Sequence, residues 1–519
     1  MVADTIPKRV TINNYDYQRT NPIYPRAGTI NWKPLQQKDA LSRFSPRFGH
    51  ATCIFRCPDD SGDDCIWLTG GHSDKYQTFD MKVSERNSDV WWSKDGSSWS
   101  KVMNIDGDYV LGLGNWDAKV PGPVAPWYSR HGHSLEALDA DGDGIMDAMI
   151  LAGGNSPVPS NDTWITTDGI HWYFDGNAPW NGRSYHASAV FKGENVIIGG
   201  TPLNNEVWSG KLVVGNQFRT GFTVQWRKIT EEVNIPFSPR AGACITTKFV
   251  PWVPTNSSVE SKYYEDLYLF GGFAGFPMND DRYDNFRCRN DVWKTNDGGN
   301  WTRILPPKGT NTMPWVGRAW HGCTTWHDRN DKTKGINLAA TNTGDAMSIQ
   351  SRLYIAGGAY LGTKRNHVVR TMEGYLDVWW SNNGSVWNKV NYDTGPRKTL
   401  YSSSEWSKLD ADDEQEHWQG KWGHTLESFF TRGDINGDGK ISSDAVYVKY
   451  FTQSTDVSSS QGKVLNVTRE DKIPSLLLIG GKFVKDGPFS NAVHQSQPGG
   501  KISTSKLICS TRFLLCSSL

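Results

Sequence analysis

The chain has 519 residues, and its 55 Lys and Arg residues balance 55 Asp and Glu residues, so the formal net charge is zero. This balance argues against a general nucleic-acid-binding protein, because such proteins need a basic excess to displace counterions from phosphates. No segment reaches the roughly 18 consecutive apolar residues that a membrane-spanning helix needs, so we expect no membrane insertion. Glycine (52 residues) and tryptophan (24 residues) are abundant, which favours strands joined by tight turns.

Six apolar runs along the chain each end in a pair of glycines. Runs of β-branched, aromatic and aliphatic residues that end in glycine predict strands buried on both faces. The pairs are Gly70-Gly71, Gly153-Gly154, Gly199-Gly200, Gly271-Gly272, Gly357-Gly358 and Gly480-Gly481. Because a repeated unit determines the whole architecture, these pairs indicate an internal repeat.

A second motif precedes every glycine pair. It is an aromatic residue, then Arg or Lys three positions later, then His after three more. The copies are Phe44/Arg47/His50, Trp127/Arg130/His133, Trp180/Arg183/His186, Phe237/Arg240/Ala243, Trp315/Arg318/His321 and Trp418/Lys421/His424. Only the fourth copy lacks the histidine.

A third motif follows the glycine pairs: an acidic residue, a tryptophan two positions on, a turn and a second tryptophan. Residues 89–99, 162–172 and 377–387 are the clearest copies, and residues 291–301 fit with a slightly shifted turn. Their Asp-Gly or Asn-Gly pairs predict tight hairpins, because both residue types tolerate positive φ. Each repeat therefore predicts four strands.

Six such sheets bury both of their faces best when they pack radially around an axis. At this point the repeats resemble the kelch motif, and residues 28–497 resemble a six-bladed kelch β-propeller of the galactose oxidase and kelch-like family. The resemblance implies an all-β fold of four antiparallel strands per blade. The blades would start near residues 47, 130, 183, 240, 318 and 421.

The last repeat lacks a final tryptophan strand, and the segment around Trp32 has the sequence expected of one. We therefore expect residues 28–36 to close the last blade and to remove its open sheet edge. Residues 1–27 would then form an N-terminal arm, and residues 498–519 a Ser-rich C-terminal tail.

Two acidic loops place oxygen donors at alternate positions before a glycine, a pattern that wraps Ca²⁺. The first offers Asp139, Asp141, Asp143, Asp147 and the Ile145 carbonyl; the second offers Asp434, Asn436, Asp438, Ser442, Asp444 and the Lys440 carbonyl. Neither loop has the Glu at position 12 of an EF-hand, and both resemble the calcium loops of integrin-type propellers. We expect two structural calcium ions; a solvated acidic turn is the alternative for each loop.

Both loops lie between the first and second strands of a blade, where the first blade has Cys57 and Cys65 flanking an acidic turn. A disulfide there would staple the hairpin and imply an oxidising compartment, although two reduced thiols fit the sequence equally well. The sequence leaves open the pairing of the remaining cysteines, which are Cys53, Cys244, Cys288, Cys323, Cys509 and Cys516.

The compartment also stays open. The first ten residues lack the apolar core of a signal peptide, so either the chain is intracellular or its leader is missing from this sequence. The calcium loops and the cysteine pair favour an extracellular or secretory location. Five Asn-x-Ser/Thr sequons occur, about the number expected by chance, at Asn161, Asn256, Asn300, Asn383 and Asn466.

Residues that recur in nearly every blade are expected to serve the packing of the blades, so a ligand site should lie where the blades differ. The long segments between second and third strands meet this condition. The candidate ligand-binding residues in them are His72, Asp74, Tyr76, Arg282, Tyr283, Arg287, Lys364, Arg365, His367 and Arg370.

These observations favour a monomeric binding module for a protein or a glycan. The alternative is a carbohydrate-directed enzyme similar to the copper radical oxidases, sugar mutarotases or sialidases that share the propeller fold. Tyr185-His186 offers the Tyr-His pair that an oxidase needs, but it lies inside the repeated motif, which already explains it. No catalytic residue is assigned.

Overall fold

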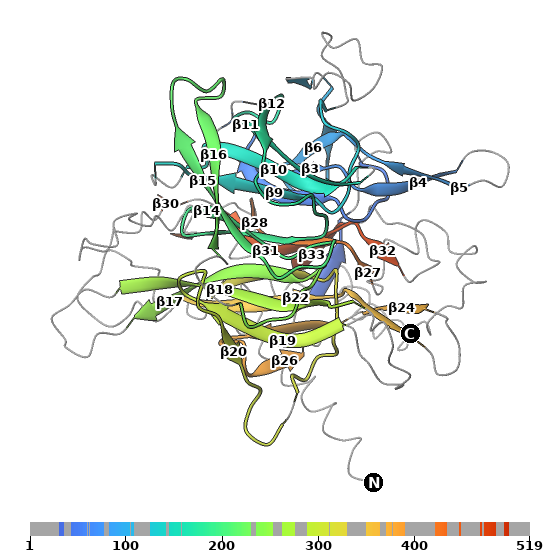
Figure 1. Cartoon of the computed structure of the whole chain (residues 1–519), viewed down its shortest axis with the longest axis vertical. Coiled ribbons are helices and arrows are strands. Elements are labelled where there is room, and N and C mark those ends of the chain that lie inside the picture. Colours follow the sequence, from blue (N-terminus) through green and yellow to red (C-terminus); the bar gives the residue numbers. More distant parts are fainter. Residues whose placement is uncertain are drawn as a thin grey trace, which may run out of the picture.

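The computed structural model describes residues 31–35, 43–59, 61, 63–76, 82–103, 105–107, 125–141, 145–156, 158–229, 235–252, 262–275, 288–310, 312–329, 349–363, 370–375, 377–389, 421–432, 446–447, 468–469, 472–483 and 493–497. Over these ranges the chain is all-β and arranged as a β-propeller (Figure 1). None of its described segments forms a helix of the length and apolarity needed to cross a membrane.

Five sheets consist of four antiparallel strands each, and we refer to each sheet as a blade. The first contains β2 (Ala51–Arg56), β3 (Asp64–Thr69), β6 (Val90–Ser93) and β7 (Ser100–Lys101). The next two contain β13 (Ala187–Phe191), β14 (Glu194–Ile198), β15 (Val207–Val214) and β16 (Phe222–Lys228), and β17 (Cys244–Trp252), β18 (Lys262–Phe273), β19 (Cys288–Thr295) and β20 (Thr302–Ile304). The last two contain β21 (Gly322–Arg329), β22 (Ile349–Ala356), β25 (Val378–Ser381) and β26 (Trp387–Lys389), and β28 (Thr425–Arg432), β31 (Lys472–Ile479), β33 (Val493–Gln497) and β1 (Asn31–Pro34).

One further sheet departs from the expected four antiparallel strands. It contains β9 (Ser134–Leu138), β10 (Ala148–Asn155), β11 (Pro159–Thr166) and β12 (His171–Asn177), and a fifth strand, β8 (Asp106–Gly107), pairs with β12 in parallel. The reason is that part of the segment leading into this blade runs alongside its outer strand.

Four two-stranded ribbons accompany the blades. They are β4 (His72–Tyr76) with β5 (Lys82–Arg86), β23 (Ala359–Thr363) with β24 (Arg370–Gly374), β27 (Lys421–Trp422) with β32 (Lys482–Phe483), and β29 (Val446–Tyr447) with β30 (Thr468–Arg469). The first two ribbons begin directly after the glycine pairs that follow β3 and β22.

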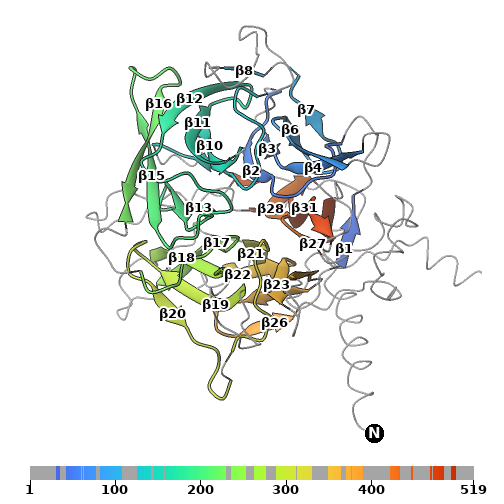
Figure 2. The ribbon, with the colours of Figure 1, turned by 45° about the vertical axis from the view of Figure 1, so that its right-hand side comes forward.

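The blades follow one another in chain order around a common centre, with the first strand of each blade innermost (Figure 2). These inner strands contact each other in turn, from β2 to β9, β13, β17, β21 and β28, and β28 contacts β2 again. The blade that begins with β28 is completed by the N-terminal strand β1, which pairs antiparallel with β33. Trp32 lies in this closing strand opposite Ser496.

The repeated arginine holds each blade together at one end. Arg47 donates to the Gly70 carbonyl at 2.7 Å and forms two hydrogen bonds with the Asp89 carboxylate at 2.6 and 2.8 Å. Asp89 also accepts a hydrogen bond from the Trp91 indole at 2.7 Å. The same pair of hydrogen bonds joins Arg130 to Asp162, Arg240 to Asp291 and Arg318 to Asp377. Arg183 instead donates once to Glu206, at 2.5 Å, and once to the Asn204 side chain, at 3.2 Å. All five arginine side chains are buried, so removing either partner would strand an unpaired charge.

The glycine pairs make room for histidines at the seams between blades. A Cβ on Gly70 would lie 2.6 Å from Cε1 of His133, which belongs to the next blade, and a Cβ on Gly71 would lie 3.0 Å from Cβ of His50. The His133 ring is fixed by a 2.9 Å hydrogen bond between its Nε2 and the Thr69 hydroxyl. Each histidine therefore wedges against the preceding blade, which explains why glycine and histidine recur together.

This wedge predicts an unequal response to two glycine substitutions. Gly70→Ala adds a clash with His133 and the Arg130 carbonyl (2.6 and 2.8 Å) to the strain of φ +59°, and should lower the free energy of unfolding by about 3 kcal/mol or more. The control Gly193→Ala has φ +75° but nothing within 4 Å of the new Cβ, and should lose only roughly 1–2 kcal/mol. Urea denaturation measures both; equal losses would mean that the wedge contributes nothing.

Candidate functional site

A closed ring of backbone hydrogen bonds surrounds the propeller axis. It is formed by the residue that lies two positions after each repeated Arg or Lys. The backbone N–H of each ring residue donates to the backbone carbonyl of the ring residue in a neighbouring repeat. These bonds run from Gly132 to Gly49, from Tyr185 to Gly132, from Gly242 to Tyr185, from Trp320 to Gly242, from Gly423 to Trp320 and from Gly49 to Gly423, all at 2.7–2.8 Å. Every member of this ring has a φ between 53° and 65°. The ring thus fixes the distance of each blade from the axis.

Tyr185 and Trp320 are the two members of the ring that are not glycine. Their φ values of 53° and 55° lie in the left-handed region, which costs an L-residue roughly 1–2 kcal/mol. Non-glycine residues held in such conformations cluster at functional sites, so the exception points to a role. A Cβ on Gly132 would touch the Tyr185 ring at 3.0 Å, and one on Gly242 would touch the Trp320 indole at 2.8 Å. Both aromatic rings therefore lie across the glycines of neighbouring blades.

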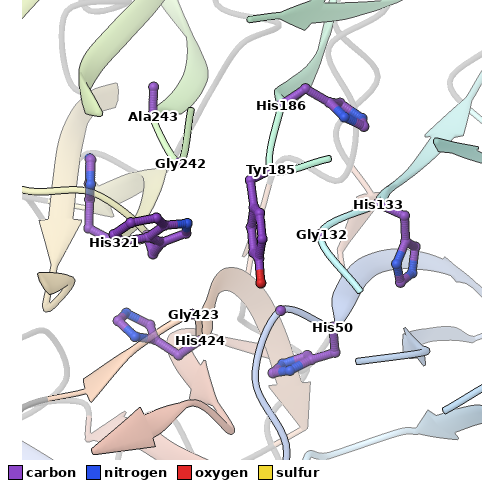
Figure 3. Close-up of a pocket in the computed structure, with 12 residues that line it drawn as sticks. His50, Gly132, His133, Tyr185, His186, Gly242, Ala243, His321, Gly423 and His424 are labelled. Atoms are coloured by element: carbon purple, nitrogen blue, oxygen red, sulfur yellow. The ribbon is translucent and has the colours of Figure 1, made fainter. Parts of the chain in front are cut away.

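A cavity of about 120 Å³ lies at this ring. Its described lining consists of the six ring residues and the residue that follows each of them. The latter are His50, His133, His186, Ala243, His321 and His424. Figure 3 shows the Tyr185 side chain extending across the cavity, with its hydroxyl directed toward the side where His50 and Gly423 lie.

Further aromatic residues surround the opening of this cavity. Five rings form a closed circuit with centroid separations of 6.2 Å from Phe48 to His131, 5.5 Å to Tyr185, 6.2 Å to Trp320, 5.7 Å to Trp422 and 4.7 Å back to Phe48. His72 packs against Phe48 and His131, and Phe273 stacks on Trp320. We call these seven residues the axial aromatic cluster.

The histidines that line the cavity are held neutral. Burial, reinforced in each case by the neighbouring Arg or Lys of the motif, lowers the pKa of His50, His186 and His424 to about 3. The same causes lower the pKa of His133 and His321 well below the ordinary value. At neutral pH these side chains therefore add hydrogen-bonding groups to the cavity wall but no charge.

Two buried carboxyl groups on inner strands have raised pKa values, in contrast to the histidines. Burial raises the pKa of Glu136 on β9 to about 7 and that of Glu427 on β28 to about 8. Glu136 accepts a hydrogen bond from the Ser188 hydroxyl at 2.6 Å, and Glu427 accepts one from the Thr52 hydroxyl at 2.5 Å. Strand β2 lies between β9 and β28 and carries the free thiol of Cys53, whose pKa is raised by burial and by both glutamates.

The structure places the predicted ligand-binding residues as follows. His72 belongs to the axial aromatic cluster, Asp74 and Tyr76 lie on β4, and Arg370 begins β24. The other six predicted residues, Arg282, Tyr283, Arg287, Lys364, Arg365 and His367, lie outside the described residues.

Sequence analysis missed the rest of the axial aromatic cluster. Tyr185 and Trp320 break a pattern that could have been found, because the position two residues after the motif's Arg or Lys is glycine in the other four repeats. Phe48, His131 and Trp422 directly follow that Arg or Lys, at a position where the other three repeats have the small residues Ser184, Ala241 and Ala319.

The first acidic loop brings three carboxylates together. Ligand oxygens of Asp139, Asp141 and Asp147 lie within 4.8 Å of one another. Two ligands of a single Ca²⁺ lie at most about 5 Å apart, because each Ca–O distance is about 2.3–2.6 Å. Asp147 is positioned by a 2.7 Å hydrogen bond from the Ala140 amide. Asp143 and the whole second loop, Asp434, Asn436, Asp438, Lys440, Ser442 and Asp444, lie outside the described residues.

Two disulfides lie within the part of the chain that the structure describes. One joins Cys57 to Cys65 across the hairpin between β2 and β3, and the other joins Cys244 to Cys323 between neighbouring blades. Cys53 and Cys288 are free and buried, and Cys509 and Cys516 lie outside the described residues. Disulfides are typical of proteins in oxidising compartments.

No family model and no curated protein matches this chain. Among solved structures, the structure of YjhT aligns with 88% of this chain and 99% of its own, with a TM-score of 0.40 and 12% sequence identity. At this level of likeness, fold and function have to be argued from the chain's own residues.

The shifted groups predict a stability maximum near pH 6.5. Above that pH the folded state keeps protons on Glu136, Glu427 and Glu265, with pKa values of about 7, 8 and 7, which the unfolded chain releases. Stability should therefore fall as pH rises toward 8.5. Below pH 6.5 the unfolded chain protonates the five cavity histidines, whose folded pKa values are depressed, so stability should fall again on acidification. Urea midpoints between pH 5 and 8.5 measure this curve; a monotonic curve would contradict it.

Glu427→Gln tests the alkaline side of this curve. The amide can still accept the Thr52 hydrogen bond but does not ionise, so the gain in stability over the wild type should be larger at pH 8.5 than at pH 5.5, where the unfolded chain has only begun to release this proton. The two gains should differ by roughly 2–3 kcal/mol. Arg227→Gln is a matched control, because its exposed ion pair with Glu194 (2.9 Å) does not involve the axis. An equal effect of Glu427→Gln at both pH values would rule out the proposed titration.

Proposed function

We propose that this chain is a six-bladed, kelch-type propeller that acts as a binding module and holds a glycan at its axial opening, with calcium stabilising the opposite face. The observation that carries the proposal is the pair Tyr185 and Trp320, held at φ values that favour glycine while their rings extend over the axial cavity. The arginine, acidic residue and tryptophan contacts repeated in successive blades support the kelch assignment.

The topology separates the two faces. The first strand of each blade starts beside the hydrogen-bonded ring and runs away from it, so the turn after this strand lies at the far face. The Cys57–Cys65 hairpin and the Asp139–Asp147 loop are such turns. The segments after the second strands return to the ring, where the ribbons β4–β5 and β23–β24 begin. The Cys57–Cys65 hairpin and the acidic loop therefore lie on one face, and the variable segments and the aromatic residues on the other.

The chemistry of the opening suits a sugar better than a cation. The cavity histidines are neutral, and Lys482 places its Nζ 5.9 Å from the centre of the Phe48 ring, where a second cation would be repelled. Aromatic faces pack against the apolar faces of a pyranose ring, and its hydroxyls need hydrogen-bond partners. The indole N–H groups of Trp320 and Trp422 are buried and have no hydrogen-bond partner among the described residues.

Replacement by glycine separates binding from folding. Tyr185→Gly and Trp320→Gly restore the residue of the other ring positions, so relief of the left-handed strain should offset lost packing and keep stability within about 2 kcal/mol of the wild type. Both variants should lose binding to the glycans that the wild type retains on an array of immobilised oligosaccharides. Trp226→Phe, at the outer strand β16, is the control. Full retention of glycan binding by both glycine variants, or no glycan retained by the wild type, would overturn the proposal.

Calcium should stabilise the fold through the first acidic loop. A Ca²⁺ ion held by Asp139, Asp141 and Asp147 binds only the folded chain, so millimolar Ca²⁺ should raise the melting temperature and a chelator should reverse the gain. Asp141→Asn should remove part of this gain. The matched control is Asp59→Asn in the disulfide-stapled hairpin, where Asp59 pairs with Lys94 at 2.8 Å, and it should keep the full gain. Identical melting curves with calcium and with chelator would exclude the ion.

A further inference from the structure

The turns between the third and fourth strands of four blades share one capping arrangement. Asp95, Asp168 and Asp297 each accept hydrogen bonds at Oδ1 from the amides two and three residues ahead. In the blade that begins with β21, Asn383 takes this place, and its Oδ1 accepts from Ser385 N at 3.0 Å and Val386 N at 3.1 Å. The amide oxygen of Asn383 thus replaces the aspartate oxygen of the other turns and faces the backbone.

The other end of the Asn383 amide is consequently directed away from the turn. The side chain is exposed, and its Nδ2 makes no hydrogen bond to any part of the chain that the structure describes. Asn383-Gly384-Ser385 is also an Asn-x-Ser sequon, the acceptor sequence for N-glycosylation. The geometry and the sequence motif therefore coincide at this residue.

The two other sequons within the described ranges differ in this respect. Asn161 is half-buried, and its Nδ2 donates to the carbonyls of Ala178 at 2.9 Å and Trp180 at 3.1 Å. A glycan on Asn161 would replace one of these donated hydrogens and would need space inside the blade. Asn300 is exposed, but its Nδ2 donates to the Asp297 carboxylate at 2.7 Å. Asn383 alone among these three combines exposure with an unengaged amide nitrogen.

We propose that Asn383 is an N-glycosylation site of this protein. Its Nδ2 forms a bond to C1 of the first sugar of a polyprenyl-diphosphate-linked oligosaccharide. The bond from C1 to the diphosphate oxygen breaks, polyprenyl diphosphate leaves, and Nδ2 gives up one proton. The reaction belongs to the secretory compartment, which the disulfides Cys57–Cys65 and Cys244–Cys323 also favour.

A glycan at Asn383 is compatible with the fold and with an open axis. It replaces an Nδ2 hydrogen and leaves both hydrogen bonds to Oδ1 intact. The turn between β25 and β26 lies on the far face, with the acidic loop and away from the axial aromatic cluster. The modification would therefore cover the face that carries the Cys57–Cys65 hairpin and the acidic loop.

The test is peptide mapping of the full chain secreted from eukaryotic cells behind a cleavable leader. Treatment with peptide N-glycosidase in H₂¹⁸O converts each occupied Asn to labelled Asp. Occupancy at each site is the label gained over an identical incubation without the enzyme, because Asn383-Gly384 also deamidates spontaneously. We expect label at Asn383 and none at Asn161. Asn383→Asp, which installs the residue of the equivalent turns, should remove that glycan mass without changing the urea midpoint. The matched variant Asn300→Asp should leave the label at Asn383 in place.

Unlabelled Asn383 in folded, secreted protein would overturn the proposal, whatever the occupancy of Asn256 and Asn466. Label at Asn161 would overturn the structural criterion on which the choice of Asn383 rests. Neither result depends on glycan binding at the axis, so this proposal and the binding proposal fail separately.

Discussion

The closed ring of backbone hydrogen bonds at the axis is the constraint on which the other features depend. It requires a left-handed residue at the same point of every repeat, because only that turn lets each N–H reach the carbonyl of its neighbour. Once the ring fixes the innermost strands, the histidine that follows five of the six ring residues falls against a glycine of the preceding blade. The arginine that precedes it falls against the carbonyl of its own glycine pair and the acidic residue beyond. Blade packing and seam packing thus follow from one local geometry.

Sequence analysis could predict the contacts that lie within a single blade or recur from blade to blade. Arg47 forms hydrogen bonds with the Gly70 carbonyl and the Asp89 carboxylate. Because other blades form equivalent contacts, the same residue types recur at the same spacing and are visible as a pattern. The Cys57–Cys65 bridge spans a single hairpin, and the need to cover the free edge of β33 pointed to the segment around Trp32. Each of these features is local or is repeated, which is why composition and spacing reveal it.

The ligand-binding candidates could not be predicted in the same way, because they come together only when the ring closes. Phe48, Tyr185, Trp320 and Trp422 come from four different blades. Each is an exception to the repeat that spacing can reveal, but only the closed ring shows that the four exceptions meet. The Cys244–Cys323 bridge spans 79 residues and joins two blades whose adjacency is a property of the fold. The fifth strand β8 has only two residues, too few for any periodicity to show.

The pairing of β1 with β33 has a consequence for how the protein is made. Asn31 lies opposite Gln497, so β1 leaves the ribosome before the blades that separate it from β33 and must wait for β33 before the final sheet can form. Until then β1 has no partner strand and the propeller is an open arc whose two ends are exposed. Contacts of such long sequence separation slow folding, and the waiting edge can pair with another chain. We therefore expect the nascent protein to be most prone to aggregation just before β33 becomes free to pair with β1, when nearly all of the blades already exist.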